Sequence, residues 1–181
     1  MNIDTLKISP LTPADVPEIQ DLLYRSWLAT YPNKGAGITE DDINDWFSGK
    51  NSKEGIARTI KSVENKHENF NALVAKIDNK AVGFCAMGKH LDYNRLAMLY
   101  ILPGYFGQGI GRSMWAAIQY YADSSKPTIL EVVLYNVRAI KFYESLGFVD
   151  TGKRITDQKN RMKSGAIPPE MVMRREPTMV L

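Results

Sequence analysis

The segment Leu96–Met114, LAMLYILPGYFGQGIGRSM, decides the fold because it changes from a strand pattern to a helix pattern across a run of glycines. Its first seven residues are almost all apolar, as in a central strand. Gly107, Gly109 and Gly111 let the backbone approach a ligand without Cβ clashes. The first amides of the following helix lack intrahelical acceptors and attract negative charge. The segment predicts a strand–loop–helix unit that binds a pyrophosphate; a glycine-rich turn used only for tight packing is the alternative.

Two common phosphate motifs do not fit this segment. A P-loop needs lysine directly after its second glycine, and Ile110 stands there. The dinucleotide fingerprint begins at Gly109 and Gly111 but requires a third glycine where Met114 stands. If the segment binds an anion, it does so through neither of these two motifs.

Outward from this segment, the periodicity predicts helices in the N-terminal third, a meander of strands, and then alternating strands and helices. Helices are expected at residues 12–31, 39–47, 51–66, 109–123 and 137–147. Strands are expected at residues 6–9, 70–77, 81–89, 96–102, 127–134, 148–154 and 168–175. This order predicts a mixed α/β (α+β) sheet, with the ligand crevice at the carboxyl end of the strand before the glycines.

Length and composition favour a single domain over residues 1–181. The single cysteine, Cys85, lies in a strand pattern and reads as a small apolar filler, so a reducing cytoplasm is expected. We expect no signal sequence and no membrane span. The net charge of +3 does not call for nucleic acid. His67 and His90 have no metal-ligand spacing, so no metal is expected.

A second motif follows in LYNVRAIKFYESLGF, residues 134–148. Its pattern, N-x-x-A-x-x-F-Y-x-x-x-G-F, begins at Asn136, 25 residues after Gly111. Together with Leu96–Met114, it resembles the GNAT family of acetyl-CoA-dependent N-acetyltransferases. The resemblance implies a GNAT-like fold: a central, mixed, mostly antiparallel twisted sheet, splayed in the middle and flanked by helices on both faces. It places the acceptor side mainly at residues 12–65 and the acetyl-CoA side mainly at 95–148.

The resemblance also implies roles for individual residues. Tyr143 would be the catalytic group beside the thioester sulfur, because a phenol can share or donate a proton to the leaving thiolate. A backbone amide near Ile101 would stabilise the oxyanion. The implied acetyl-CoA-binding residues are Leu99, Tyr100, Ile101, Gly107, Gln108, Gly109, Ile110, Gly111, Arg112, Ser113, Asn136, Phe142 and Tyr143.

Two positions depart from the family pattern. Phe106 stands where the family usually has Gln or Arg, which predicts a weaker or rearranged cofactor contact. Arg95 stands where many members have a glutamate near the start of the central strand. A carboxylate base at that position is therefore in doubt, and a proton relay through water is the alternative.

The acceptor side holds aromatic and acidic residues. The spacing of Trp27 and Tyr31 resembles the GNAT subgroup that acetylates polyamines. The acceptor candidates are Trp27, Tyr31, Glu40, Asp41 and Trp46, since a polycation suits carboxylates and aromatic faces. The alternative is structural: acids favour helix N-termini, and aromatic residues at helical spacing usually face the core.

The expected function is acetyl transfer from acetyl-CoA to a primary amine, such as spermidine or spermine, by direct attack. A protein N-terminus, a lysine or a small drug amine is the alternative acceptor, and a non-catalytic acyl-CoA-binding module is the alternative class. The expected partner is a small-molecule or peptide amine, with no nucleic acid and no membrane. A homodimer is expected by analogy only.

Overall fold

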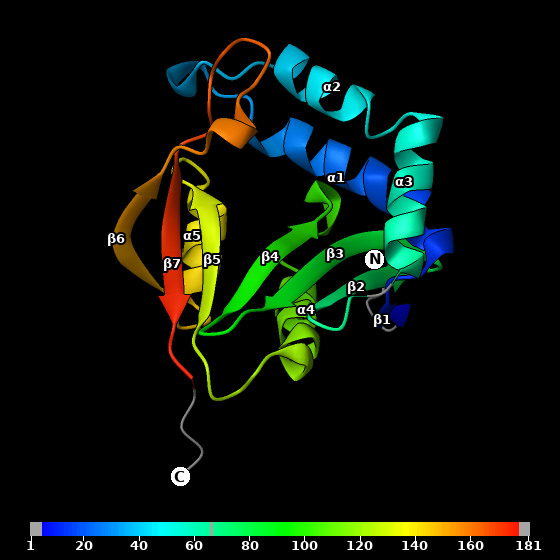
Figure 1. The fold of residues 1–181 in the computed structure, drawn as a ribbon, viewed down its shortest axis with the longest axis vertical. Coiled ribbons are helices and arrows are strands. Elements are labelled where there is room, and N and C mark those ends of the chain that lie inside the picture. The colour runs from blue at the N-terminus through cyan, green and yellow to red at the C-terminus, as the bar shows by residue number, and fades with distance from the viewer. Residues whose placement is uncertain (1–4, 66, 178–181) are drawn as a thin grey trace.

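The computed structural model describes residues 5–65 and 67–177 (Figure 1). Residues 1–4, 66 and 178–181, which fall in the expected domain and, for 66, in an expected helix, lie outside the described residues. The strands are β1 (Lys7–Pro10), β2 (Phe70–Ile77), β3 (Lys80–Lys89), β4 (Asn94–Ile101), β5 (Thr128–Val133), β6 (Val149–Ile155) and β7 (Glu170–Arg175). The helices are α1 (Val16–Thr30), α2 (Glu40–Ser48), α3 (Lys53–Glu64), α4 (Ile110–Ile118) and α5 (Val137–Glu144). Single 3-10 turns lie at Pro13–Asp15, Lys34–Ala36, Pro103–Tyr105, Gln119–Tyr121 and Gln158–Asn160.

The strands form one sheet in the order β1-β2-β3-β4-β5-β7-β6. Every neighbouring pair is antiparallel except β4 and β5, which run parallel. The predicted mixed, mostly antiparallel sheet is therefore confirmed. The helix expected to reach residue 123 is wrong at its end, because α4 stops at Ile118 and a 3-10 turn follows. Ala122 is already extended, and the chain turns there toward β5.

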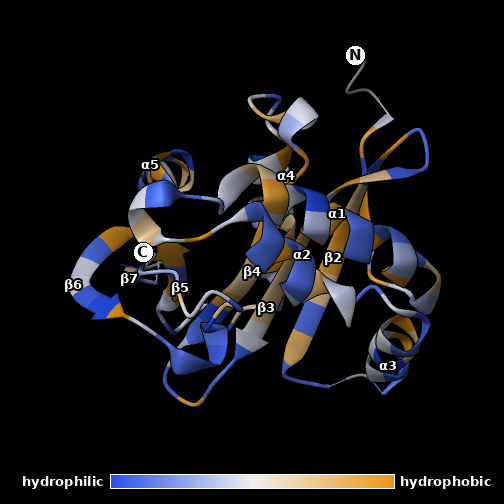
Figure 2. Ribbon diagram, turned by 90° about the horizontal axis from the view of Figure 1, so that it is seen from above, coloured by the Kyte–Doolittle hydropathy of each residue, from blue (hydrophilic) through white to orange (hydrophobic). Residues whose placement is uncertain are grey.

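Apolar side chains pack on both faces of the sheet. On one face, Met114 and Ile118 of α4 and Tyr143 of α5 belong to the largest core cluster. On the other face, Ile19 and Leu22 of α1 pack against β2 and β3. In Figure 1, α1, α2 and α3 gather above the sheet and α4 lies below it. In the view from above (Figure 2), α2 shows mainly hydrophilic residues. No helix within the two described ranges is long and apolar enough to cross a bilayer.

The sheet opens between β4 and β5. These strands pair only at Asn94 with Thr128 and at Arg95 with Ile129. Beyond Arg95, β4 stays paired to β3 up to Ile101, and β5 stays paired to β7. Beyond these two pairs, the edges of β4 and β5 that face each other are unpaired, which agrees with the implied sheet that is splayed in the middle.

A bulge in β4 sets which side chains face each side of this opening. The β3–β4 register pairs Met87 with Leu96 and Ala86 with Met98, which leaves one extra residue on β4. An extra residue reverses the alternation of side chains along a strand. Leu96 and Ile101 consequently both face the α4 side, and Tyr100 faces the α1 side.

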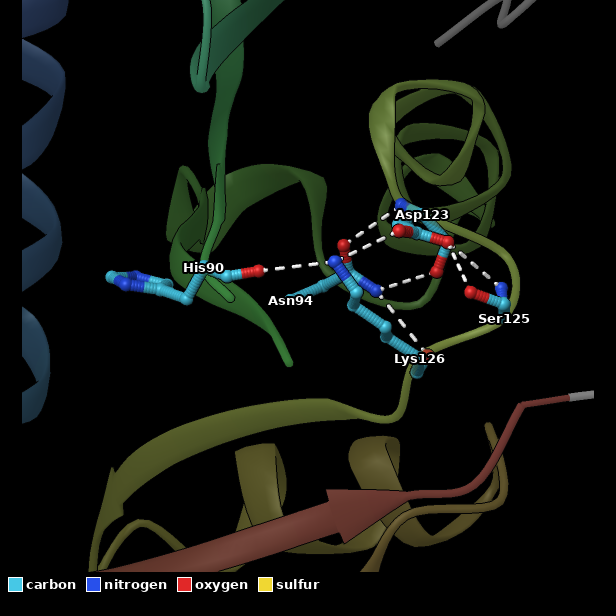
Figure 3. A network of polar contacts seen from close by, with 5 residues as sticks. All are labelled: His90, Asn94, Asp123, Ser125 and Lys126. Carbon is cyan, nitrogen blue, oxygen red and sulfur yellow. Dashed lines mark hydrogen bonds and ion pairs between the residues drawn. The ribbon is translucent and has the colours of Figure 1, made fainter. Parts of the chain in front are cut away.

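The closed end of the opening is held by Asn94, which is only 1% exposed (Figure 3). Its Nδ2 donates to the carbonyls of Asp123 (2.8 Å) and Lys126 (3.3 Å), and its Oδ1 accepts from the amide of Asp123 (2.8 Å). Its backbone amide donates to the carbonyl of Pro127 at 2.8 Å. The side chain thus ties the loop that leads into β5 to the first residue of β4.

Candidate active site

A cavity of about 960 Å³ fills the opening between β4 and β5. One end is lined by α1 and the residue after it, including Ser26 and Tyr31. The other end is lined by the glycine loop and the start of α4, including Gly107, Gly109 and Arg112. Residues of β4, β5 and α5 form the walls between them. One continuous cavity therefore connects an anion-binding loop to the face of the sheet that α1 covers.

The glycine loop has the geometry of an anion cradle. Gly107 and Gly109 adopt φ values of 76° and 80°, a backbone conformation that residues with a Cβ atom rarely adopt. Gly109 is the N-cap of α4, so the first amides of this helix have no acceptor within it. A Cβ at Gly111 would lie 3.2 Å from the ring of Phe142, so glycine permits that ring to pack on the helix start. The loop offers backbone donors and the positive end of a helix dipole to a ligand in the cavity.

Of the predicted loop residues, two do not line the cavity. Nε2 of Gln108 donates back to the carbonyl of Gly104 at 3.2 Å, and Ser113 is exposed on α4 outside the lining. Arg112 does line the cavity, and its guanidinium donates to Oγ of Ser145, the residue that follows α5, at 3.0 Å. The cradle is therefore made of backbone with one flanking arginine.

Asn136, the N-cap residue of α5, and Tyr143, within α5, line the same cavity as the glycine loop. Oδ1 of Asn136 accepts from the amide of Ala139 at 3.2 Å and caps the helix, which leaves the Nδ2 hydrogens for a ligand. Tyr143 is 8% exposed and lines the cavity. Burial raises the pKa of Tyr143 well above its ordinary value, so the phenol keeps its proton. Among the described residues, nothing hydrogen-bonds the Tyr143 hydroxyl, and it remains an available donor.

The opposite end of the cavity is rich in tyrosine. The hydroxyls of Tyr31 and Tyr100 lie 3.3 Å apart, and the Tyr135 hydroxyl donates to the carbonyl of Tyr31 at 2.8 Å. All three residues line the cavity. Burial raises the pKa of Tyr31 and that of Tyr100, so both phenols stay neutral. The bulge in β4 makes this contact possible, because it turns Tyr100 toward α1.

The other acceptor candidates lie outside the cavity lining. Trp27 stacks on Tyr31 with ring centroids 4.4 Å apart, and it also stacks with Trp46 at 5.8 Å. Trp27 therefore packs directly against Tyr31, and Trp46 packs against Trp27. Glu40 and Asp41 are exposed at the start of α2 and do not line the cavity. Their part in acceptor binding stays a prediction.

The sequence did not predict that Arg95, Glu131 and Glu170 come together near the tyrosines. Arg95 forms an ion pair with Glu131 across β4 and β5. Glu170 opens β7 directly opposite Val133, which lines the cavity. Burial and the nearby charge of Glu131 raise the pKa of Glu170 to about 7. The available signal was a glutamate within an apolar strand pattern, TILEVV, but only the sheet order brings these residues together.

The parallel strands β4 and β5 splay apart beside the glycine cradle, and the buried Tyr143 lines the cavity between them. This arrangement suits an acyltransferase. Residues 68–150 match the model of the acetyltransferase (GNAT) domain. This match covers somewhat less than half of the chain and indicates an acetyl-CoA-dependent N-acetyltransferase. The matched range runs from just before β2 to the start of β6 and includes the cradle, Asn136 and Tyr143.

Solved structures share the fold over nearly their whole length. The PaiA N-acetyltransferase from Thermoplasma acidophilum, in complex with coenzyme A, is 22% identical, with a TM-score of 0.72 over 94% of this chain and 98% of that chain. The ribosomal-protein-S18-alanine N-acetyltransferase from Escherichia coli is 21% identical, with a TM-score of 0.65 over 97% and 96%. Ard1 from Thermoplasma volcanium is 18% identical, with a TM-score of 0.65 over 97% and 99%.

The cavity suits acetyl-CoA, the acetyl donor of this family. The positive-φ glycines and the free amides of α4 fit a pyrophosphate, since a Cβ at Gly107 or Gly109 would meet nothing within 4 Å. The unpaired edge of β4 supplies backbone donors and acceptors for an extended amide chain. When bound, acetyl-CoA supplies the activated acetyl group.

Replacing Gly109 by valine is expected to raise KM for acetyl-CoA about five- to tenfold, because a β-branched residue is strained at φ 80° and deforms the cradle. Gly104→Val is the matched control, since Gly104 has no positive φ and no neighbour within 4 Å of a Cβ. Steady-state kinetics at saturating amine measure both. Equal KM values for the two variants would show that the cradle does not bind the cofactor.

Proposed function

We propose that this protein transfers acetyl from acetyl-CoA to a primary aliphatic amine by direct attack within a ternary complex. One observation carries the proposal: a single cavity joins the amide cradle to the tyrosine-lined end, and Tyr143 lies in its wall. A donor and an acceptor bound from opposite ends would meet beside the opening of the sheet. No covalent acyl-enzyme is needed, because the amine reaches the thioester carbonyl itself.

Two donors serve the charges that develop during the transfer. The Leu102 amide donates to Val82 on β3, so by the alternation of strand amides the Ile101 amide points into the opening. That amide is positioned to stabilise the oxyanion on the acetyl carbonyl. The Tyr143 hydroxyl, which keeps its proton, donates to the departing thiolate.

Glu170 is the proposed acceptor of the proton that the amine must lose. It shares a sheet face with Val133, and its charge acts on Tyr31, Tyr100 and Tyr135, which line the cavity. Arg95 is paired to Glu131, so Glu170 is the carboxylate left without a hydrogen bond in this part of the described structure. The proton would pass to Glu170 through water beside these phenols.

Replacing Glu170 by glutamine is expected to remove a pH-dependent step in kcat. A carboxylate accepts a proton only when ionised, so wild-type kcat should rise with pH and level off above the Glu170 pKa of about 7. The groups that set this midpoint are Arg95, Glu131 and Asp157, with the three tyrosines nearby. In Glu170→Gln the rise near pH 7 should vanish, and kcat at pH 8 should fall about tenfold.

The matched control for this pH profile is Glu144→Gln, because Glu144 is exposed on α5 outside the cavity lining. It should keep both the wild-type midpoint and the wild-type rate at saturating amine. If Glu170→Gln also kept the rise near pH 7, Glu170 would not be the proton acceptor.

A polyamine is the proposed acceptor. Its primary amine would reach the thioester past Tyr31, and its further ammonium groups would meet phenol rings and the carboxylates of Glu131 and Glu170. Trp46 already binds a cation this way, since Nζ of Lys50 lies 3.7 Å from its ring centroid. The Thermoplasma acidophilum PaiA structure provides the fold comparison for this proposal.

An amine panel tests the acceptor. Free-thiol release from acetyl-CoA would be followed with spermidine, spermine, lysine, a lysyl peptide, a peptide with a free N-terminal alanine and an aminoglycoside. The proposal expects the highest kcat/KM with the polyamines. A preference for the N-terminal peptide would replace the polyamine by a protein acceptor, and no turnover with any amine while acetyl-CoA still binds would favour a binding module.

A further inference from the structure

The ring of Phe106 lies at the glycine-loop end of the cavity, where an apolar side chain is unexpected in a site for an anion. Phe106 lines the cavity next to Gly107 and is 38% exposed. The Arg138 guanidinium lies over this ring, with Cζ 4.3 Å from the ring centroid. Arg138 belongs to α5 and lines the same cavity. The pair therefore links the loop and α5 across the mouth of the cradle.

Arg138 occupies an unfavourable place for a cation. It is the second residue of α5, and the positive end of a helix dipole disfavours positive charge there. Across residues 5–65 and 67–177, no carboxylate pairs with Arg138, and its ring contact with Phe106 is the interaction that the structure provides. A cation held by an aromatic face keeps its N–H groups free to bind an anion.

Arg112 lines the same cavity from the first turn of α4. Its guanidinium donates to Oγ of Ser145, the residue that follows α5, at the opposite end of that helix from Arg138. Two arginines, one from α4 and one from α5, therefore line the cavity that the glycine loop also lines. Guanidinium groups match phosphate oxygens better than any other side chain does.

We propose that Arg138, held against Phe106, binds a phosphate group of acetyl-CoA. Phe106 is then a positioning residue, which holds the Arg138 guanidinium at the mouth of the cradle. The proposal rests on acetyl-CoA as the donor, but it does not depend on which amine accepts the acetyl group.

Equilibrium binding separates this proposal from the proposed function. Isothermal titration of the wild-type chain would use acetyl-CoA, 3′-dephospho-acetyl-CoA and S-acetylpantetheine. Arg138→Gln should weaken acetyl-CoA binding about tenfold or more, the effect expected for a lost charge-assisted bond, and should leave S-acetylpantetheine binding unchanged. The dephospho compound identifies which phosphate Arg138 binds. If Arg138→Gln weakens binding of 3′-dephospho-acetyl-CoA as much as binding of acetyl-CoA, the arginine binds the pyrophosphate. If it does not weaken binding of the dephospho compound, the arginine binds the 3′-phosphate.

Two further variants sharpen the test. Lys141→Gln removes a positive charge from the same helix outside the cavity lining, so it should bind acetyl-CoA as the wild type does. Phe106→Leu should weaken acetyl-CoA binding a few-fold through the lost ring contact. Wild-type affinity in Arg138→Gln, or an equal loss for S-acetylpantetheine, would overturn the proposal. Failure of the wild type to bind acetyl-CoA would instead overturn the proposed function.

Discussion

Tyr143→Phe is expected to lower kcat by roughly tenfold to a hundredfold or more, the range for loss of a general acid. The substitution removes only the hydroxyl and keeps the ring that packs against Phe142 and Phe148, with centroids 5.3 Å and 5.8 Å away. Burial raises the pKa of the Tyr143 phenol, so the hydroxyl keeps its proton over the whole working pH range. Because a thiol, with a pKa of about 8.5, is a stronger acid than this phenol, the hydroxyl would stabilise the departing thiolate chiefly by donating a hydrogen bond to it.

The measurement is thiol release at saturating acetyl-CoA and amine, together with the Kd for acetyl-CoA. The Kd should change little, because the cradle is intact. Tyr120→Phe is the matched control, since Tyr120 is 87% exposed and lies outside the cavity lining. A Tyr143→Phe enzyme with wild-type kcat would exclude Tyr143 as the acid.

Asn94→Ala is expected to lower the free energy of unfolding by about 2–4 kcal/mol. The side chain makes three hydrogen bonds to backbone groups of the loop before β5, and its loss leaves buried donors and acceptors without partners. For a chain of this size, that loss corresponds to a fall in Tm of very roughly 5–15 °C. Because Asn94 closes the sheet opening, the folded variant should also bind acetyl-CoA more weakly.

Urea unfolding followed by circular dichroism measures the change, with Asn51→Ala as control. Asn51 is exposed in the turn between α2 and α3, so its replacement should leave stability within about 0.5 kcal/mol of the wild type. If both variants unfolded at the same urea concentration, the loop before β5 would be held by contacts other than Asn94.

The acetyl-CoA side was predictable from sequence because its elements are local. The change from apolar strand to glycines to helix within Leu96–Met114 specifies the cradle through backbone geometry alone. Asn136 and Tyr143 follow at fixed positions on one short helix. The cap bond of Asn136 and the burial of Tyr143 need only that helix to pack against the sheet.

The acceptor side was less predictable because it depends on contacts between distant segments. Arg95 meets Glu131 only because β4 and β5 are neighbours, and Glu170 joins them only because β7 lies beside β5. The bulge that turns Tyr100 toward Tyr31 has no signature in an evenly apolar strand. Glu40 and Asp41 were predicted as acceptor-binding residues from their charge, but the fold places them at the exposed start of α2, outside the cavity lining.

Arg138 is visible in the sequence as an unusual residue for a helix start, but the sequence alone does not explain it. An arginine in the first turn of a helix runs against the usual preference for acids there. Only the structure shows Phe106 beneath it. The apolar ring in the loop and the arginine on α5 are then parts of one arrangement.

Initial-rate kinetics with both substrates varied test the direct transfer most directly. Acetyl-CoA would be varied at several fixed concentrations of spermidine, and the mass of the chain would be recorded after incubation with acetyl-CoA alone. Direct attack in a ternary complex predicts intersecting reciprocal plots and an unchanged chain mass. Parallel plots, with an acetyl group carried on the chain in the absence of amine, would contradict the account.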